Sequence, residues 1–466
     1  MAAPATIAEL RTAGYPDRSV KQELSANLAK RLASGQPMFE TIIGFDDSVL
    51  PALERGILAC HDIILLGERG QAKTRLIRRL VDLLDESIPV IAGCEINDHP
   101  YHPICAGCRA AVAEQGDLTP ITWIGREARF SEKLATPDTS VADLIGDVDP
   151  IRVAEGRYLS DELVIHYGLI PRTHRGILSI NELPDLPERI QVSLLNILEE
   201  RDVQIRGFKV RLPLDLILVA SANPEDYTHR GRIISPLKDR FGSQVRTHYP
   251  EVPEDEILIM DQEAKTPDVG VPIHVPVFLK EVLAELTAQL RRSPKINQHS
   301  GVSVRYSIGN LETLMASAVR RAVLSNEQVA VARPVDLWGL LETSMGRIEF
   351  DTMEEGREPR ILLGGMKASI ADVFRRRLGG FNFGPWVEQF DQGLEVTSSD
   401  TQPAAEFLGQ FGTVPGLTAL LSKLDVAQES PAQAAAAIEF ALEGLHLTRR
   451  VNKYAGGRGS WRFGAN

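Results

Sequence analysis

The sequence predicts an α/β fold, a parallel sheet with helices on both faces, followed by an α-helical domain and a C-terminal, mainly helical region. Two observations support this prediction. Short apolar runs alternate with amphipathic helical segments from about residue 39 to 250, and continuous apolar runs of this length are typical of strands buried in a parallel sheet. After residue 250 the strand signal fades and helical spacing dominates.

Residues 1–38 are expected to form a helical lead-in, and residues 39–250 the α/β core. Four branched apolar runs predict its strands: IILL (63–66), PVIAG (89–93), GILSI (176–180) and DLILVASAN (215–223). Two segments with helical spacing predict helices between them: TRLIRRLVDLLDE (74–86) and ERIQVSLLNILEERD (188–202). Alternation of strand and helix favours a doubly wound sheet.

Residues 251–350 are expected to form a helical lid, with helices over 277–293, 307–325 and 335–350. The remaining region, 351–466, is expected to be mainly helical. It contains an alanine-rich helix over 430–450, in which Pro431 follows Ser430 as proline often does at a helix start. The basic tail 449–463 is expected to be solvated or to contact another subunit.

Length, charge and cysteine content limit the function classes. At about 150 residues per domain, 466 residues suggest three domains. The net charge of −12 disfavours nonspecific binding to nucleic acid or anionic lipid. Four cysteines do not make a disulfide scaffold and indicate a reducing compartment. Apolar runs are far shorter than the roughly 20 residues of a membrane helix, and no signal peptide is recognised, so we expect a cytoplasmic protein.

A phosphate-binding loop follows the first predicted strand and opens a helix. A strand, a glycine-containing loop and Lys-Thr at a helix start form the context that a P-loop requires. Loop N–H groups and the helix N-terminus bind phosphates, Lys73 would reach the β- and γ-phosphates, and Thr74 would ligate Mg²⁺. Ala72 stands where the pattern has its second glycine. The predicted nucleotide-binding residues of the loop are Gly67, Glu68, Arg69, Gly70, Gln71, Ala72, Lys73 and Thr74.

The strand GILSINE ends in Asn181 and Glu182, where P-loop ATPases place an acid pair. The first position holds the Mg²⁺ water shell, and here it is an amide without charge. Glu182 is the predicted general base. Magnesium binding would therefore depend more on Thr74 and on the phosphates themselves.

Three further residues are predicted to act in catalysis. Asn223 ends the next strand and could orient the attacking water. Arg240, at the end of SPLKDRF (235–241), could reach the γ-phosphate of a neighbouring subunit. Arg305, in GVSVR (301–305), could sense the γ-phosphate from the helical domain.

The order and spacing of these elements resemble the AAA+ ATPases. The resemblance is strongest to the clade of the magnesium-chelatase I subunit and the MoxR-type ATPases, and it covers about 40–310. Besides the loop, the matching segments are TIIGFDDSVLPALERGI (41–57), THRGILSINE (173–182), SLLNILEERDVQIRG (193–207), ANPEDY (222–227), SPLKDRF and GVSVR, with FALEGLH (440–446) near the C-terminal end.

The resemblance implies a P-loop AAA+ core with ATP and Mg²⁺ as ligands. Ile42, Ile43 and Gly44 would line the adenine pocket. Residues 141–172 resemble the helix-two insertion of the clade, and 203–213 its pre-sensor hairpin. Such proteins form hexameric rings, usually with a partner that carries a von Willebrand A domain. The departures at Ala72 and Asn181 bear on magnesium binding and turnover, and not on the fold.

Three cysteines and two histidines lie within residues 93–108. Thiolates and imidazole at such spacing suit tetrahedral Zn²⁺. The predicted ligands are Cys94, Cys105, Cys108 and His102, with His99 as the alternative fourth ligand. A closed site of this kind would staple a cysteine-rich insertion in the core. Packed free thiols, or a redox pair formed by the Cys-x-x-Cys segment, are the alternatives.

Together these patterns predict a ring-forming ATPase that couples ATP hydrolysis to remodelling of a partner protein. One alternative is the motor subunit of a true magnesium or cobalt chelatase. Another, motivated by Asn181, is a nucleotide-binding scaffold that hydrolyses slowly or not at all.

Overall fold

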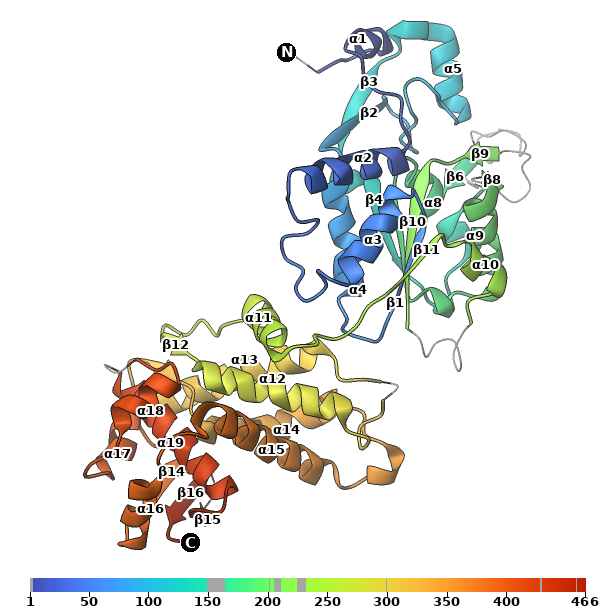
Figure 1. Cartoon of the computed structure of the whole chain (residues 1–466). Coiled ribbons are helices and arrows are strands. Elements are labelled where there is room, and N and C mark those ends of the chain that lie inside the picture. Colours follow the sequence, from blue (N-terminus) through green and yellow to red (C-terminus); the bar gives the residue numbers. More distant parts are fainter. Residues whose placement is uncertain are drawn as a thin grey trace. The chain divides into compact units, whose positions relative to one another are not determined.

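The computed structural model describes residues 3–148, 164–200, 202–204, 211–223, 232–298, 300–427, 430–457 and 459–466. The chain forms two compact units, Met1–His248 and Tyr249–Asn466 (Figure 1). The finer domain boundaries expected from the sequence stay predictions. Within the described residues, no helix is both long and apolar enough to cross a membrane.

A five-stranded parallel sheet forms the centre of the first unit, in the order β11-β1-β10-β7-β4. In this order, Leu66 at the end of β1 lies opposite Ala222 and Arg246 on its two neighbours. Because parallel strands end at the same edge, the residues that follow β1, β7 and β10 come together there. The strands are β1 Ile63–Leu66, β4 Phe130–Leu134, β7 Gly176–Asn181, β10 Leu216–Ala222 and β11 Ser243–Arg246.

Helices cover both faces of this sheet, as Figure 1 shows. Successive residues of a strand point to opposite faces. Ile63 and Leu65 therefore pack in one buried cluster with α2, α3 and α4, whereas Ile64 and Leu66 pack in another with α9 and α10. This arrangement confirms the predicted α/β class. The helices are α2 Val20–Ala33, α3 Val49–Leu58, α4 Lys73–Arg79, α9 Glu188–Glu200 and α10 Ser235–Arg240.

Buried charges attach the predicted lead-in helix α2 to the sheet. The Arg129 guanidinium donates to both carboxylate oxygens of Glu23 at 2.8 and 2.7 Å, and these residues are 1% and 4% exposed. Lys21 pairs with the buried Asp62 at 2.9 Å. A buried pair of this kind is strongly destabilising when one partner is removed, so α2 is an integral part of the first unit.

Three strand assignments differ from the sequence prediction. The first three residues of the PVIAG run fall in β2 Ser87–Ile91, which pairs antiparallel with β3 Ile121–Gly125 outside the main sheet. The two strands β4 and β11 were not predicted. They are the edge strands of the sheet, with sequences FSEKL and SQVR, and an edge strand carries polar side chains that hide the apolar signal.

Around β2 and β3 lie α1 Ile7–Thr12 and α5 Ala106–Gln115, which Figure 1 shows at one end of the first unit. Ile7 and Leu10 of α1 pack on Ile121 of β3. The Trp123 indole N–H donates to the Pro4 carbonyl at 2.9 Å. The start of the chain is thereby joined to the cysteine-rich insertion.

The remaining short elements of the first unit include two antiparallel strand pairs. Residues 149–163 of the expected insertion 141–172, residues 205–210 of the expected hairpin 203–213, and residues 224–227 of ANPEDY lie outside the described residues. The elements are η1 Leu80–Leu83, η2 Gly116–Leu118, η3 Arg126–Arg129, α6 Val141–Leu144, β5 Gly146–Val148 paired with β6 Ile165–Tyr167, α8 Leu169–Arg172, η5 Leu183–Asp185, and β8 Asp202–Gln204 paired with β9 Arg211–Pro213.

The second unit is mainly helical and has one hydrophobic core that extends from Met260 to Phe463. The helix predicted over 335–350 is broken into three short pieces. The long helices are α11 Pro253–Glu263, α12 Val277–Arg292, α13 Val304–Leu324, α15 Glu358–Leu378 and α19 Pro431–Leu447. The shorter elements are β12 Ile273–His274, β13 Ala330–Val331, η7 Pro334–Gly339, α14 Leu340–Ser344, η8 Met345–Arg347, η9 Thr352–Glu354, α16 Gly384–Asp391, α17 Ala404–Gly409 and α18 Leu417–Lys423.

The basic tail is structured, which corrects the expectation of a solvated segment. Strands β15 Asn452–Gly457 and β16 Ser460–Gly464 form a hairpin that pairs with β14 Val396–Ser399. Phe463 is fully buried in the core of the unit. Alternation of aromatic and polar residues in SWRFG is the strand signal that the basic composition obscured.

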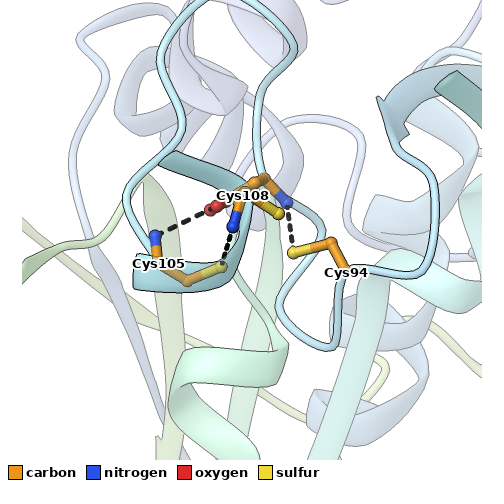
Figure 2. Close-up of side chains that lie close together, drawn as sticks. Cys94, Cys105 and Cys108 are labelled. Atoms are coloured by element: carbon orange, nitrogen blue, oxygen red, sulfur yellow. Dashed lines mark hydrogen bonds between the residues drawn. The ribbon is translucent and has the colours of Figure 1, made fainter. Parts of the chain in front are cut away.

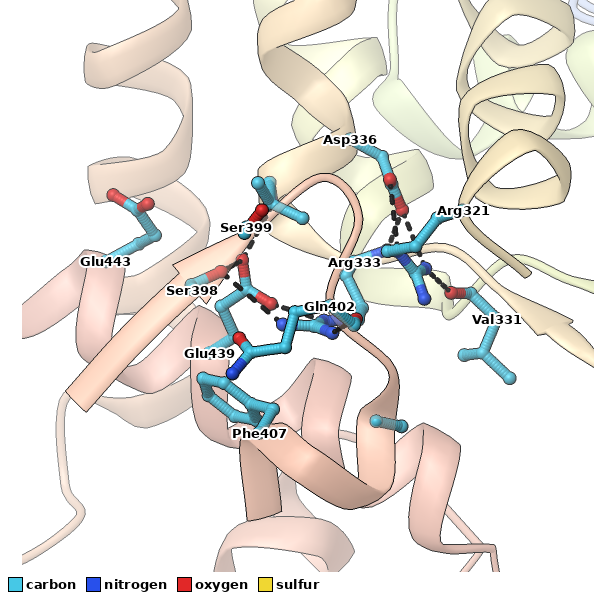
Figure 3. A network of polar contacts seen from close by, with 12 residues as sticks. Arg321, Val331, Arg333, Asp336, Ser398, Ser399, Gln402, Phe407, Glu439 and Glu443 are labelled. Atoms are coloured by element: carbon cyan, nitrogen blue, oxygen red, sulfur yellow. Dashed lines mark hydrogen bonds and ion pairs between the residues drawn. The ribbon is translucent and has the colours of Figure 1, made fainter. Parts of the chain in front are cut away.

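A buried ionic network joins the helices of the second unit to its small sheet (Figure 3). Arg333 donates to Glu439 of α19 at 2.6 Å and to the Gln402 carbonyl at 3.0 Å. Arg321 of α13 pairs with Asp336 at 3.0 Å. Every one of these charges has a hydrogen-bonded partner, as buried charges require. The network therefore connects the predicted lid to the C-terminal region within one unit.

Candidate functional site

The loop after β1 is held in shape by its own side chains and by the end of β11. The Gln71 side-chain oxygen accepts hydrogen bonds from the Glu68 N–H at 3.0 Å and from the Thr247 hydroxyl at 2.8 Å. A Cβ atom at Gly67 would collide with both the Gln71 oxygen and the Thr247 hydroxyl. A side chain at position 67 would force Gln71 and Thr247 to shift, and glycine avoids this because it has no Cβ atom.

Ala72 adopts a left-handed conformation, with φ 54° and ψ 13°, at the start of α4. This position therefore needs a positive φ, as the missing glycine suggested, and alanine occupies it at a cost of about 1–2 kcal/mol. Ala72 packs against the cluster formed by α2, α3 and α4, and this packing offsets part of the strain. The loop thus keeps a left-handed conformation at this position without a glycine.

Lys73 is 6% exposed and lies inside the loop. Its ammonium group donates to the carbonyl oxygens of Gly67 and Glu68, the second at 2.8 Å, and to the Asn223 side-chain oxygen at 2.8 Å. A buried ammonium group needs such acceptors. The same three N–H groups can instead donate hydrogen bonds to phosphate oxygens, which are stronger acceptors because they are charged.

Asn223 connects Lys73 to Glu182. While its oxygen accepts from Lys73, its amide donates to a Glu182 carboxylate oxygen at 3.0 Å. Glu182 follows β7 in a left-handed conformation with φ 54°, a strain of the type that clusters at functional sites. The structure therefore brings three sequence-predicted residues from three neighbouring strand ends into one hydrogen-bonded chain.

Asn181 lies beside a carboxylate that the sequence analysis missed. Its amide donates to Glu132 of β4 at 2.5 Å, and its oxygen accepts from the Ser221 hydroxyl at 3.4 Å. Glu132 also accepts two hydrogen bonds from Arg78 of α4, at 2.8 and 3.1 Å. The sequence could have indicated Glu132 only if strand β4 had been recognised, because a single glutamate in FSEKL belongs to no motif.

The other predicted nucleotide-site residues are spread over both units. Ile42 is buried in the same cluster as Leu76 and Ile77 of α4, and Gly44 has φ 77°. Arg240 lies on the surface of the first unit, where it pairs with Glu199 at 2.9 Å. Arg305 is exposed in the first turn of α13 in the second unit. Their roles stay predictions.

A cavity of about 410 Å³ opens beside the loop. Its walls come from the loop itself, from the end of β11 and from α10, and they carry two cationic side chains. The lining residues are Leu66, Gly67, Glu68, Gln71, Lys238, Gln244, Arg246 and Thr247. The loop, the buried lysine and the strand-end polar groups together fit a nucleoside triphosphate with Mg²⁺. Lys73 would hold the phosphates, and Thr74 and the side-chain oxygen of Asn181 would hold Mg²⁺ and its water shell.

A second cluster lies at the cysteine-rich insertion. Ligand atoms of Cys94, Asp98, Cys105 and Cys108 all lie within 4.8 Å of one another, and none of the cysteines forms a disulfide. Figure 2 shows the three cysteines side by side, with backbone N–H groups donating to two of the sulfur atoms. The fourth group beside the sulfur atoms is therefore Asp98, and His102, the predicted fourth ligand, lies apart from them.

The histidines lie outside the cluster for a physical reason. The His102 side chain is 66% exposed, and its Nε2 forms a 2.7 Å hydrogen bond with Asp17. The buried His99 turns its Nε2 toward the same carboxylate, at 3.8 Å. Asp17 lies in the segment that precedes α2. The two imidazoles therefore point toward that segment and not toward the three sulfur atoms.

The electrostatics of the cluster reflect crowding of acidic groups. Hydrogen bonds from Cys105 and Cys108 lower the pKa of the Cys94 thiol to about 4. Burial, and then the nearby Cys105, raise the pKa of Asp98 to about 7. Hydrogen bonding to its neighbours also raises the pKa of Cys108. These shifts follow from the close approach of four acidic groups in a poorly solvated place.

Comparison with known proteins gives the family context. Residues 123–241 match the family described as AAA domain (dynein-related subfamily). This range contains β4, β7, β10 and α10, and it begins after the phosphate loop. The chain is 28% identical over 255 residues to "Magnesium-chelatase subunit ChlI" of Nostoc sp. (strain PCC 7120), an alignment that covers 54% of this chain and 63% of that protein.

Two further similarities were found. The "Magnesium-chelatase 38 kDa subunit" of Cereibacter sphaeroides is 27% identical over 238 residues, covering 48% of this chain and 62% of that protein. A solved complex between subunits BchI and BchD of magnesium chelatase aligns at a TM-score of 0.35 and 22% identity, covering 69% of this chain and 99% of that chain. The chain thus spans somewhat less than two thirds of the curated relatives that it matches.

Proposed function

We propose that this chain, which contains an AAA domain and is a distant homologue of magnesium-chelatase I subunits, is an ATPase that couples ATP hydrolysis to remodelling of a partner protein. The observation that carries the proposal is the chain of hydrogen bonds from Lys73 through Asn223 to Glu182. It joins a phosphate-binding cation, a water-orienting amide and a general base at one edge of a parallel sheet, where α/β proteins bind ligands.

Each residue has a distinct role in the proposed reaction. The loop N–H groups and Lys73 hold the phosphates, and Thr74 takes part in binding Mg²⁺, which supplies charge neutralisation on the phosphate oxygens. Glu182 accepts the proton of the attacking water, and Asn223 orients that water. Asn223 and Glu182 are already hydrogen-bonded, so little rearrangement is needed before the water is activated.

Glu132 supplies the negative charge that Asn181 lacks. The Asn181 amide lies against the Glu132 carboxylate, and Asn181 is 7% exposed, so the charge acts through the amide in a poorly solvated place. A carboxylate so placed polarises the amide and makes its oxygen a better acceptor for the Mg²⁺ water shell. On this proposal Glu132 keeps an acidic group beside the site although residue 181 is neutral.

An exchange of the two side chains tests this role of Glu132. Asn181→Asp is expected to weaken Mg·ATP binding about tenfold, because two adjacent carboxylates cannot both ionise. The double variant Glu132→Gln with Asn181→Asp should restore the affinity. Calorimetric titration of a slowly hydrolysed ATP analogue, with and without Mg²⁺, measures the change. Tighter Mg²⁺-dependent binding by Asn181→Asp alone would remove Glu132 from the proposal.

We further propose that the chains assemble in a ring, hexameric as in related ATPases, with a partner that carries a von Willebrand A domain. The solved complex of BchI with BchD shows a two-subunit assembly for that relative. Arg240 supports the ring. It ends α10 on the surface, where an arginine can enter the site of a neighbour, and its present partner Glu199 is itself half exposed at 45%.

Mixing two inactive variants tests whether Arg240 acts between chains. Arg240→Ala is expected to lower kcat by about 10³-fold with unchanged ATP affinity. Mixed in equal amounts with Glu182→Gln chains, it should recover about a quarter of the wild-type rate, because one in four interfaces of a head-to-tail ring pairs two intact halves. Arg189→Ala, an exposed arginine on α9, is the matched control. An inactive mixture contradicts action in trans.

Two other functions have a specific observation in their favour. The names of the relatives favour the motor subunit of a magnesium or cobalt chelatase, which copurification with a large porphyrin-binding subunit would support. The neutral Asn181 favours a nucleotide-binding scaffold with little hydrolysis. A steady-state ATPase assay separates the scaffold from both motors.

A further inference from the structure

We infer that Cys94, Asp98, Cys105 and Cys108 bind one Zn²⁺ ion in a closed, structural site. Their four ligand atoms lie within 4.8 Å of one another. Around an ion with Zn–S bonds of about 2.3 Å, tetrahedral ligands are about 3.8 Å apart, so a single ion fits the cluster with small adjustments. Three thiols select a soft or borderline metal over Mg²⁺ or Ca²⁺.

Asp98 gives the strongest evidence for a cation. The residue is completely buried, and its Oδ2 accepts from the backbone N–H groups of Ile104 and Cys105 at 3.2 and 3.0 Å. Its Oδ1 has no hydrogen-bond partner among the described residues. A buried carboxylate oxygen without a partner costs several kcal/mol, and this one lies beside three sulfur atoms, where a cation would satisfy it.

The backbone around the cluster is arranged as it is around metal-bound thiolates. Cys94 Sγ accepts from the N–H groups of Ile96 and Asp98, at 3.4 and 3.3 Å. Cys105 Sγ accepts from the Cys108 N–H at 3.3 Å, and Cys105 caps α5 (Figure 2). These donors favour the charged sulfur and orient it, which neither a packed thiol nor a disulfide requires.

The ion would fasten the insertion to the core of the first unit. Cys94 follows β2, and Cys105 begins α5. Cys105 and Cys108 belong to the same buried cluster as Leu178 and Ile180 of β7. Zinc would therefore tie the end of β2 to the start of α5, and the two cysteines of α5 pack in the same cluster as the strand that carries Asn181. With all four positions supplied by protein, the site has no open position for catalysis.

Metal analysis of the full chain, purified without chelator, tests the inference. We expect about one zinc per chain in the wild type and in the control variants His102→Ala and Cys60→Ser, and almost none in Cys105→Ser. Asp98→Ala should weaken zinc affinity by roughly 100-fold, measured by competition with a chromogenic chelator. Asp98→Cys, which keeps a fourth ligand, should retain the ion.

A second measurement is made on the wild-type chain and does not depend on whether Cys105→Ser folds. The Co²⁺-substituted wild-type chain should show the intense visible absorption of a tetrahedral thiolate site, shifted in Asp98→Cys and unchanged in His102→Ala. A wild-type chain with less than about 0.3 zinc per chain, a Cys105–Cys108 disulfide, or loss of zinc in His102→Ala would each overturn the assignment.

Discussion

Replacing Glu182 by glutamine is expected to lower the steady-state ATPase rate by about 10²–10⁴-fold, the usual contribution of a positioned general base. Glutamine keeps the size of the side chain and can still accept the 3.0 Å hydrogen bond from Asn223, but it cannot take a proton from water. The affinity for ATP should change little, because Glu182 does not belong to the phosphate loop. The measurement is phosphate release under saturating Mg·ATP, together with calorimetry for binding.

The matched control is Glu127→Gln, which changes an exposed glutamate of the same unit and should leave the rate unaltered. Equal background rates in the wild type and in Glu182→Gln would contradict the motor proposal and favour a scaffold. A large loss of ATP affinity would instead assign Glu182 to nucleotide binding.

Replacing Lys73 by alanine is expected to weaken ATP binding by at least about 100-fold, which corresponds to about 2.7 kcal/mol. The ammonium group is the cation of the hydrogen-bonded chain Lys73–Asn223–Glu182, and it lies in a buried place where charge–charge attraction is poorly screened. Its removal also leaves the Gly67 and Glu68 carbonyls and Asn223 without this donor. A loss of folding stability of about 1–3 kcal/mol should therefore accompany it.

Fluorescence titration with a labelled ATP analogue measures the affinity, and thermal unfolding without nucleotide measures the stability. Lys30→Ala removes an exposed lysine of α2 and should alter neither. If Lys73→Ala binds ATP as tightly as the wild type while remaining folded, the nucleotide does not use this loop. The cavity that contains Lys238 and Arg246 would then be the next place to test.

Several parts of the fold could be predicted because their signal is local. The strand at 63–66, the loop and the start of α4 follow from an apolar run, glycines and Lys-Thr. The strands β7 and β10, which precede Glu182 and Asn223, are buried on both faces and therefore mostly apolar. The edge strands β4 and β11 could not be recognised, because one side of each lacks a neighbouring strand and their sequences are polar.

The prediction that 89–93 forms a strand of the main sheet was wrong for the opposite reason. Pro89, Val90 and Ile91 are buried like the residues of a central strand, but they pair with β3 in a separate two-stranded sheet. Apolar composition indicates burial and does not specify the partner strand. The same limit explains Glu132, whose relation to Asn181 depends on the pairing of β4 with β7.

The cysteine cluster shows most directly which features follow from the sequence and which depend on the tertiary structure. The sequence by itself determined that three thiols lie within 15 residues of one another, and it predicted Lys73, Glu182 and Asn223 as residues of a phosphate site. Only the tertiary structure decided that Asp98, and not His102, completes the cluster, and that Glu132 stands beside Asn181. The physical reason is that residue types and local spacing specify which chemistry is possible, whereas the direction of a side chain depends on packing against segments that are distant along the chain.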